Sequence, residues 1–428
     1  MVISRKQYQN QLEGFWLGES IANHTGLITE LDKDGTTTEK SDFYTDANWG
    51  LPDPVVGSWV TGKPPIVDFV LNRTNNIWRS DDDTDLEYIY LHLLSTLKTS
   101  ILTPEQIRDG WIAYIWDETK ETPYGLDWDG TYQNWLWVSN QSAHTLMLEQ
   151  NMVPPDTSDP VNNKNYLMID AQLTTEIFGV FAPARWDVAL DMAYLPIRTT
   201  ARDEAAWISE FYVIMHSLAS VVDPELTMEE KVMWLAKQAR KRLPEDSFAS
   251  GMYDYVLSEF EKNPDNWEDA RDQVYTHYQD SSNDGYRFLN ASDAGINFAA
   301  SLVSLFYGRG HLPRTIQIGS LAGWDSDNPT ATWGGLLGFL LGADGVKCAF
   351  AAPDLEYGYL ISATRKDLPD HTPDSPGEDN FTLMASRGLE ITDRAIVEEM
   401  GGTIDTENNS WIIPVKDLNI PYGTKIDK

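Results

Sequence analysis

Two acidic clusters are the clearest candidates for chemistry in this chain. The first is Asp81-Asp82-Asp83, and the second is Asp325-Ser326-Asp327-Asn328. Their side chains offer hard oxygen donors, which suit magnesium, manganese or calcium better than zinc or copper. Two divalent cations held between two such clusters would form the clamp that is used in metal-assisted hydrolysis. The pair therefore predicts a hydrolytic metal site.

Each cluster by itself also has a simpler explanation, which is the capping of a helix. Negative charge is favoured at a helix N-terminus, and Asp is a preferred N-cap residue. Because adjacent helical residues point about 100° apart, three consecutive aspartates can face one ion only from the turn before a helix. We expect Ser80 to cap the helix after the first cluster and Pro329 to open a glycine-rich helix after the second. The two clusters together favour the metal site over two separate caps.

The composition limits the partners of the chain. Its 428 residues are 42% hydrophobic, so a large core can form, and the formal net charge is -34. Strong binding to nucleic acid or to an anionic membrane is not expected, because both require clustered basic residues. The single Cys348 excludes an internal disulfide and a thiolate zinc cluster. Since neither a secretory signal nor a membrane-spanning run is evident, we expect a cytoplasmic protein.

Helical patterns dominate the sequence. Thr103-Pro104-Glu105-Gln106 and Thr227 with Glu230 form capping boxes before apolar residues at helical spacing. Further helices are expected over residues 168–180, 204–222, 252–262, 293–307, 330–341 and 389–400. Residues 20–78 are rich in Gly, Pro, Thr, Asn and Asp, which predicts a long loop or lid.

A small β-hairpin is predicted near the end of the chain. Its strands are Thr403–Asp405 and Trp411–Val415, separated by Asn408-Asn409. The prediction is an all-α fold with this hairpin as an appendage. The helical domain would span residues 1–363, and a C-terminal extension with a small α/β element would span residues 364–428.

The order of the motifs resembles the ADP-ribosylglycohydrolase family. Gly14-Phe-Trp-Leu-Gly18-Glu19-Ser20 is similar to the Gly-x-x-x-Gly-Asp-Ala motif of that family, and Asp81-Asp82-Asp83-Thr84 is similar to its Thr-Asp-Asp-Thr motif. Gly323-Trp324-Asp325-Ser326-Asp327-Asn328 is similar to its Gly-x-Asp-Thr-Asp-Thr motif. The resemblance runs from about residue 8 to residue 345. It implies an orthogonal all-α bundle with two divalent cations, Mg²⁺ or Mn²⁺.

The resemblance also implies roles for individual residues. The implied metal ligands are Asp81, Asp82, Asp83, Asp325, Asp327 and Asn328. The implied substrate-binding residues are Gln172, Glu176, Trp324 and Asp203, although a helix N-terminus explains Asp203 equally well. In the implied mechanism, ribose hydroxyls bind the metals and an activated water attacks the anomeric carbon.

Several positions depart from the family pattern. Glu19 stands in place of Asp, and both Asp81 and Asn328 stand in place of Thr. The position of the family's loop glutamate falls near Gly26, so the catalytic acid or base is left unassigned. The candidates, by proximity only, are Glu19, Glu30 and Asp46.

Three functions remain open from the sequence. The first is release of ADP-ribose from a modified protein, nucleic acid or small molecule. The second is hydrolysis of another N-glycoside or nucleoside, which would be a ribose-containing metabolite. The third is a non-catalytic ADP-ribose-binding relative.

Overall fold

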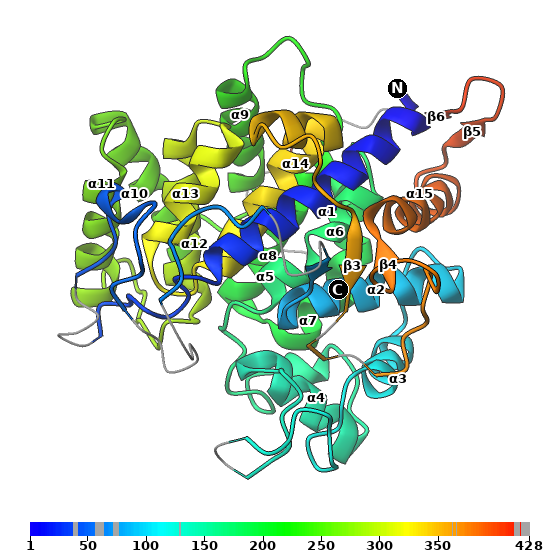
Figure 1. The fold of residues 1–428 in the computed structure, drawn as a ribbon, viewed down its shortest axis with the longest axis horizontal. Helices are drawn as coiled ribbons and strands as arrows, with labels where there is room; N and C mark the ends of the chain where they lie inside the picture. The colour runs from blue at the N-terminus through cyan, green and yellow to red at the C-terminus, as the bar shows by residue number, and fades with distance from the viewer. Residues whose placement is uncertain are drawn as a thin grey trace. The chain divides into compact units, whose positions relative to one another are not determined.

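The computed structural model describes residues 1–36, 42–55, 64–71, 77–127, 130–361, 363–364, 366–414 and 420. Helices dominate these residues, and the two sheets each contain three short strands (Figure 1). The predicted all-α fold class is confirmed. Among the described residues, no helix is both long enough and apolar enough to cross a membrane.

The chain divides into two compact units. The first unit comprises Met1–Glu13, Asn72–Ser220 and Glu356–Leu418, and the second comprises Gly14–Leu71, Val221–Leu355 and Asn419–Lys428. The predicted division into residues 1–363 and 364–428 stays a prediction.

Helices of the first unit pack around α6, α7 and α8, while α15 packs on α2 and α6. These helices are α2 (Asp82–Leu97), α3 (Pro104–Tyr114), α4 (Val138–Gln150), α5 (Ala171–Thr175), α6 (Ile177–Phe181), α7 (Trp186–Thr200), α8 (Asp203–Ala219) and α15 (Phe381–Glu398), with the short helix η3 (Asp156–Ser158). The helix predicted over residues 168–180 is therefore two short helices separated at Glu176.

Both sheets belong to the first unit. One has the order β1 (Val2–Ser4), β6 (Ser410–Ile412), β5 (Thr403–Asp405), with antiparallel pairing. The other has the order β2 (Trp78–Arg79), β3 (Gly358–Leu360), β4 (Asp379–Asn380), with β2 and β3 parallel. The predicted hairpin is confirmed as β5 and β6, although β6 ends at Ile412 and Val415 lies outside the described residues.

Helix α12 forms the centre of the second unit. It packs against α9, α10, α11, α13 and α14, and all of its residues are buried. This burial follows from a sequence that is apolar or small on every face. The helices of this unit are α9 (Met228–Arg240), α10 (Phe248–Lys262), α11 (Trp267–Val274), α12 (Ala294–Gly308), α13 (Leu312–Ala322) and α14 (Asp327–Ala349), with the π-helix η4 (Tyr275–Asp280) and the short helix η1 (Asp46–Asn48).

Helix α1 (Arg5–Gly26) corrects the predicted start of the long loop at residue 20. The helical run continues through the buried Ile21 and Ala22, and the Thr25 hydroxyl donates a hydrogen bond to the Ile21 carbonyl over 2.6 Å. Thr25 and the glycine that follows it therefore belong to the helix, because apolar residues at helical spacing outweigh their low helix propensity.

Predicted helix caps are confirmed at α3 and α9 and corrected at α2. Thr103 and Thr227 each form the reciprocal capping box. At α2 the N-cap is Asp81 instead of Ser80, and its carboxylate accepts hydrogen bonds from the Thr84 amide (2.8 Å) and hydroxyl (2.6 Å). The cap moves by one residue because a carboxylate can accept both hydrogen bonds at once.

Asp293, the N-cap of α12, provides a test of buried charge in the second unit. Its carboxylate accepts a hydrogen bond from the Gly295 amide over 2.8 Å, and burial raises its pKa from 3.8 to about 6. Because the pKa is raised in the folded state, the contribution of Asp293 to stability is fully present below pH 3.8. This contribution is lost as the pH rises through about 6.

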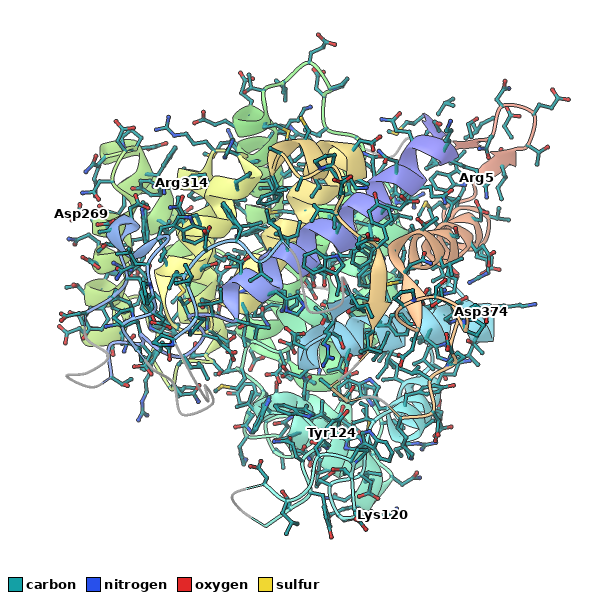
Figure 2. All side chains as sticks on the ribbon, in the orientation of Figure 1. Arg5, Lys120, Tyr124, Asp269, Arg314 and Asp374 are labelled. Carbon is teal, nitrogen blue, oxygen red and sulfur yellow. The ribbon has the colours of Figure 1, made fainter. Side chains whose placement is uncertain are left out.

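Asp293→Asn should therefore stabilise the protein at pH 8 by about 1–3 kcal/mol and have little effect at pH 4, because Asn is neutral and caps equally well. Thermal unfolding across this pH range would measure the difference. The exposed Asp374 (Figure 2) supplies the control, and Asp374→Asn should leave the profile unchanged. A difference between Asp293→Asn and wild type that does not vary with pH would contradict the prediction.

Candidate active site

In the second unit, the end of α1 lies directly against the start of α14. A Cβ atom on Gly26 would collide with the backbone of Asp327 and with the Ser326 carbonyl. The Ser326 hydroxyl donates a hydrogen bond to the Gly26 carbonyl over 3.1 Å. Thr29 lies 3.1 Å from the same hydroxyl and donates to the Ser320 carbonyl. These contacts hold the chain after α1 onto the loop before α14.

Two backbone hydrogen bonds of Trp324 extend this contact. The Leu31 amide donates to the Trp324 carbonyl, and the Trp324 amide donates to the Lys33 carbonyl, both over 2.8 Å. Leu31 and Trp324 both have φ of 57°, a left-handed conformation that residues with a side chain rarely adopt. Such conformations persist where the surroundings enforce them, often at functional sites. The segments on either side of Glu30 and Asp325 are thus fixed against each other.

This arrangement brings Glu30, Asp325 and Asp327 together. One carboxylate oxygen from each lies within 4.8 Å of the others. Asp325 and Asp327 are buried, and Glu30 is half-buried. Three carboxylates at this range repel one another unless a cation or protons balance them, and their hard oxygens suit Mg²⁺ or Mn²⁺. The residues therefore fit a divalent cation.

Neighbouring residues support the second acidic cluster. Asn297 of α12 accepts a hydrogen bond from the Asp325 amide over 3.1 Å, which fixes the backbone at that position. Asn328 is fully buried in the first turn of α14, next to Asp327. The assignment of Asn328 as a metal ligand stays a prediction.

The first acidic cluster lies in the first unit, at the start of α2. Asp81 and Asp83 are buried, and Asp82 is half-buried. The Asn140 side chain of α4 donates a hydrogen bond to Asp83 over 3.0 Å. The capping explanation therefore applies to Asp81, while Asp82 and Asp83 occupy the first helical turn. Their roles as metal ligands stay predictions.

Asp170 joins the start of α4 to the region before α5. Its carboxylate accepts hydrogen bonds from the Ser139 hydroxyl (2.5 Å) and the Asn140 amide (3.0 Å), and burial raises its pKa to about 6. Asn140 thus connects two aspartates that are far apart in the sequence. No sequence pattern singled out Asn140, because the contact depends on how α4 packs.

The predicted substrate-binding residues occupy different environments. In the first unit, Gln172 and Glu176 are buried, whereas Asp203 is exposed at the start of α8, with φ of 47°. In the second unit, Trp324 is fully buried and its ring packs on Phe43 at 4.8 Å. In this position, Trp324 supports the loop that carries Asp325. Contact of these four residues with substrate stays a prediction.

The three candidates for the catalytic acid or base also differ. Glu19 is buried within α1. Asp46 is exposed, and hydrogen bonds from Arg314 at 2.6 and 2.8 Å lower its pKa, which disfavours proton donation. Glu30 is the candidate that the structure groups with Asp325 and Asp327.

Gln279 of η4 bridges the two segments that carry this group. Its amide nitrogen donates to the Asp34 carbonyl, and its amide oxygen accepts from the Trp324 indole, both over 2.7 Å. The π-helical turn positions Gln279 for both contacts. Gln279 is thus a positioning residue for the carboxylate group.

Gln279→Ala should weaken Mn²⁺ binding by about 10-fold, because residues that orient metal ligands commonly have effects of this size. Isothermal titration with Mn²⁺ would measure it. Gln273, which is exposed on the adjacent α11, is the matched control, and Gln273→Ala should bind Mn²⁺ as wild type does. Equal affinity of Gln279→Ala and wild type would contradict the assignment.

Comparisons with known proteins place this geometry in context. A family model described as ADP-ribosylglycohydrolase matches residues 4–371, which include both acidic clusters and Glu30. Among solved structures, the chain is similar to one titled "ADP-ribosylglycohydrolase-related protein complex", with 15% identity and a TM-score of 0.47, over 91% of this chain and 99% of that chain. A search of curated proteins found no match.

Proposed function

The chain belongs to the ADP-ribosylglycohydrolase family, a family of hydrolases, and from this premise we propose that it releases ADP-ribose from a modified acceptor with Mg²⁺ or Mn²⁺. The observation that carries the proposal is the grouping of Glu30, Asp325 and Asp327 within 4.8 Å. Three carboxylates at this range, two of them buried, are costly without a cation, so they favour a metal site over a structural role.

The proposed ligands come from both acidic clusters. Asp325, Asp327 and Asn328 of the second unit and Asp81, Asp82 and Asp83 of the first unit are the residues that we propose as ligands of two divalent cations. Bound divalent cations would orient ribose hydroxyls and lower the pKa of a coordinated water. The hydrogen bond from the Asp325 amide to Asn297 fixes the backbone that carries this carboxylate, which favours a preorganised site.

Glu30, whose carboxylate lies beside the proposed cation ligands Asp325 and Asp327, is our proposal for the proton-accepting group. It is the half-buried member of the group, so water and substrate can reach it, whereas Asp325 and Asp327 are buried. In hydrolysis of a glycosidic bond, a carboxylate takes the proton of the attacking water as the bond to the leaving group breaks. The left-handed Leu31 fixes the backbone that carries Glu30.

A second candidate is hydrolysis of a nucleoside or another N-glycoside. Asp81 and Asn328 stand where the family pattern has Thr, and Asp81 adds a negative charge to the proposed ligand set, whereas Asn328 changes only its geometry. A changed charge would alter how tightly a diphosphate-bearing substrate binds relative to an uncharged nucleoside.

Incubation with Mn²⁺ or Mg²⁺ and ADP-ribosylated Arg and Ser peptides would test the proposal. We expect release of ADP-ribose, detected chromatographically, and its loss on chelation. No release while calorimetry shows bound Mn²⁺ would overturn the ADP-ribose version. Turnover of nucleosides under the same conditions would support the second candidate.

A further inference from the structure

Residues 116–137 of the first unit carry an exposed aromatic surface. The aromatic residues in the described part of this segment are Trp116, Tyr124, Tyr132, Trp135 and Trp137. The Tyr124 side chain is 36% exposed and that of Trp135 is 40% exposed, and their rings meet edge to face at 5.9 Å. We call Tyr124 and Trp135 the aromatic shelf. Leu126 and Trp137 of the same segment are also exposed. Exposed aromatic groups of this kind are typical of binding surfaces.

The backbone enforces the display of Trp135. Trp135 has φ of 60° and the β-branched Val138 has φ of 27°, both in the left-handed range. The side chain of Gln133 accepts a hydrogen bond from the Trp135 amide over 2.6 Å. The side chain of Asn134 accepts one from the Leu136 amide over 3.1 Å, and Leu136 is buried. Strain of this kind persists where the surrounding structure enforces it, often at functional sites, and here it accompanies one large ring exposed to solvent.

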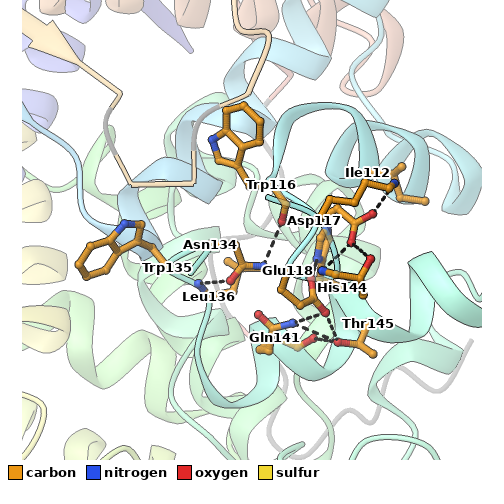
Figure 3. Close-up of polar contacts among 12 residues, drawn as sticks. Ile112, Trp116, Asp117, Glu118, Asn134, Trp135, Leu136, Gln141, His144 and Thr145 are labelled. Atoms are coloured by element: carbon orange, nitrogen blue, oxygen red, sulfur yellow. Dashed lines mark hydrogen bonds and ion pairs between the residues drawn. The ribbon is translucent and has the colours of Figure 1, made fainter. Parts of the chain in front are cut away.

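A polar network connects this turn to α4. Glu118 accepts hydrogen bonds from Gln141 (2.8 Å) and Thr145 (2.9 Å), and His144 lies 3.4 Å from its other oxygen. Burial by itself would raise the pKa of Glu118. The hydrogen bonds from His144 and Thr145 lower it by more than burial raises it, so the pKa is lowered and the carboxylate is charged. Asn134 donates to Glu118 over 3.4 Å. Figure 3 shows the Trp135 ring projecting away from these contacts.

The shelf lies close along the chain to the proposed metal ligands of the first unit. Trp137 is the N-cap of α4, and Asn140 in the first turn of that helix donates to Asp83. Asn140 is five positions after Trp135, so the two are at most about 18 Å apart. A peptide of about five residues spans that distance when extended.

The charge around the shelf is negative. In the described part of residues 116–137, the acidic residues are Asp117, Glu118, Glu121 and Asp127. The segment's one basic residue is Lys120, which is labelled in Figure 2 and pairs with Asp117 at 2.6 Å. Aromatic faces attract Arg and Lys cations, and the net charge of -34 adds a long-range attraction.

We propose that the aromatic shelf binds a basic segment of a protein acceptor, with Arg or Lys side chains a few residues from the modified one. This inference rests on the proposed function for the identity of the substrate. It deepens that function by naming the substrate class: a protein whose modified residue lies in a positively charged segment. The binding energy comes from cations stacked on Trp135 and Tyr124.

Binding of unmodified labelled peptides tests the shelf without any turnover. Fluorescence anisotropy would compare a nine-residue peptide containing three Arg with the same peptide carrying Gln instead. We expect tighter binding of the Arg peptide, and a loss of about 3- to 10-fold for Trp135→Ala and for Tyr124→Ala, with Trp135→Phe intermediate. Val161, which is 79% exposed in the same unit, is the matched control, and Val161→Ala should bind as wild type does. Equal binding of both peptides, or of Trp135→Ala and wild type, would overturn the proposal.

Kinetic measurements then distinguish a role of the shelf in substrate binding from a role in the chemical step. For ADP-ribosylated peptides, Trp135→Ala should raise KM for the Arg-flanked peptide by the same factor and leave kcat unchanged. Turnover of free ADP-ribosyl-arginine should not change. Weaker binding of ADP-ribose itself to Trp135→Ala would show that the shelf holds a nucleotide ring, which overturns the proposal. The wild-type protein could also bind the Arg peptide through the shelf and hydrolyse no ADP-ribosylated substrate. That result would support the shelf as a binding surface and refute the proposed function.

Discussion

Replacing Asp327 by Ala should lower the rate of ADP-ribose release by at least about 100-fold, because one removed charge-stabilising group commonly has an effect of this size. Asp327 is buried and lies with Glu30 and Asp325 within 4.8 Å. Without it, two carboxylates remain at that site, and the affinity for a divalent cation falls. Initial rates at saturating Mn²⁺, together with a Mn²⁺ titration, would measure both losses.

The stability of the apo protein distinguishes a metal ligand from a structural residue. Removing one of three neighbouring carboxylates relieves repulsion, so the Tm of Asp327→Ala without metal should equal or exceed that of wild type. The Mn²⁺-induced rise in Tm should disappear, because that rise measures binding to the folded state. A lower apo Tm with an undiminished response to Mn²⁺ would assign Asp327 to the fold instead.

Asp344 is the matched control for this substitution. It lies on the same helix, α14, and is exposed. Asp344→Ala should retain the rate, the Mn²⁺ affinity and the Tm of wild type. Comparable losses in both variants would indicate a general effect of charge and would contradict a site at Asp327.

The elements that the sequence predicted correctly are those decided by local interactions. The capping boxes of Thr103 and Thr227 lie within one turn of the helices they begin, and both are confirmed. The all-α class follows from apolar residues at helical spacing, which requires no knowledge of neighbouring elements. The cap at Asp81 differs by one residue from the prediction at Ser80, because two oxygen acceptors compete within the same turn.

The grouping of Glu30 with the second acidic cluster could not be predicted in the same way. It depends on the extension of α1 to Gly26, on left-handed Leu31 and Trp324, and on hydrogen bonds between segments far apart in the chain. Propensity and periodicity describe single elements and contain no information about such contacts. From the sequence, Glu30 and Asp46 were equal candidates for the catalytic acid or base. The ion pair between Asp46 and Arg314 now disfavours Asp46.

Glycines at the crossing of α1 and α14 determine where those contacts form. The backbones of the two helices approach closely at Gly14 and Gly18 on α1 and at Gly334 and Gly338 on α14 (Figure 1). A Cβ on Gly338 would collide with the Gly14 carbonyl, and one on Gly18 with the Gly334 carbonyl. The obstructing atoms are backbone atoms, so the helices themselves would have to move apart.

Gly338→Ala should therefore destabilise the protein by about 3 kcal/mol or more, since overpacking outweighs the roughly 1 kcal/mol that Ala gains over Gly in a helix. Chemical denaturation would measure the free energy of unfolding. Gly251 of α10 is the matched control, because a Cβ there would make ordinary contacts with Asp284 at 3.4 Å. Gly251→Ala should be neutral or stabilising. Equal effects of the two substitutions would contradict close packing as the reason for Gly338.

Gly338→Ala should also weaken cation binding at the proposed metal site. The crossing at Gly338 and Gly18 sets the position of Gly26 against Asp327, and Gly26 leads directly into the segment of Glu30. Helices forced apart would therefore separate Glu30 from Asp327, and Mn²⁺ affinity should fall in the folded Gly338→Ala protein at a temperature well below its Tm. Unchanged Mn²⁺ affinity with reduced stability would show that the loop contacts at Ser326 and Trp324 hold the carboxylates together without help from the helix crossing.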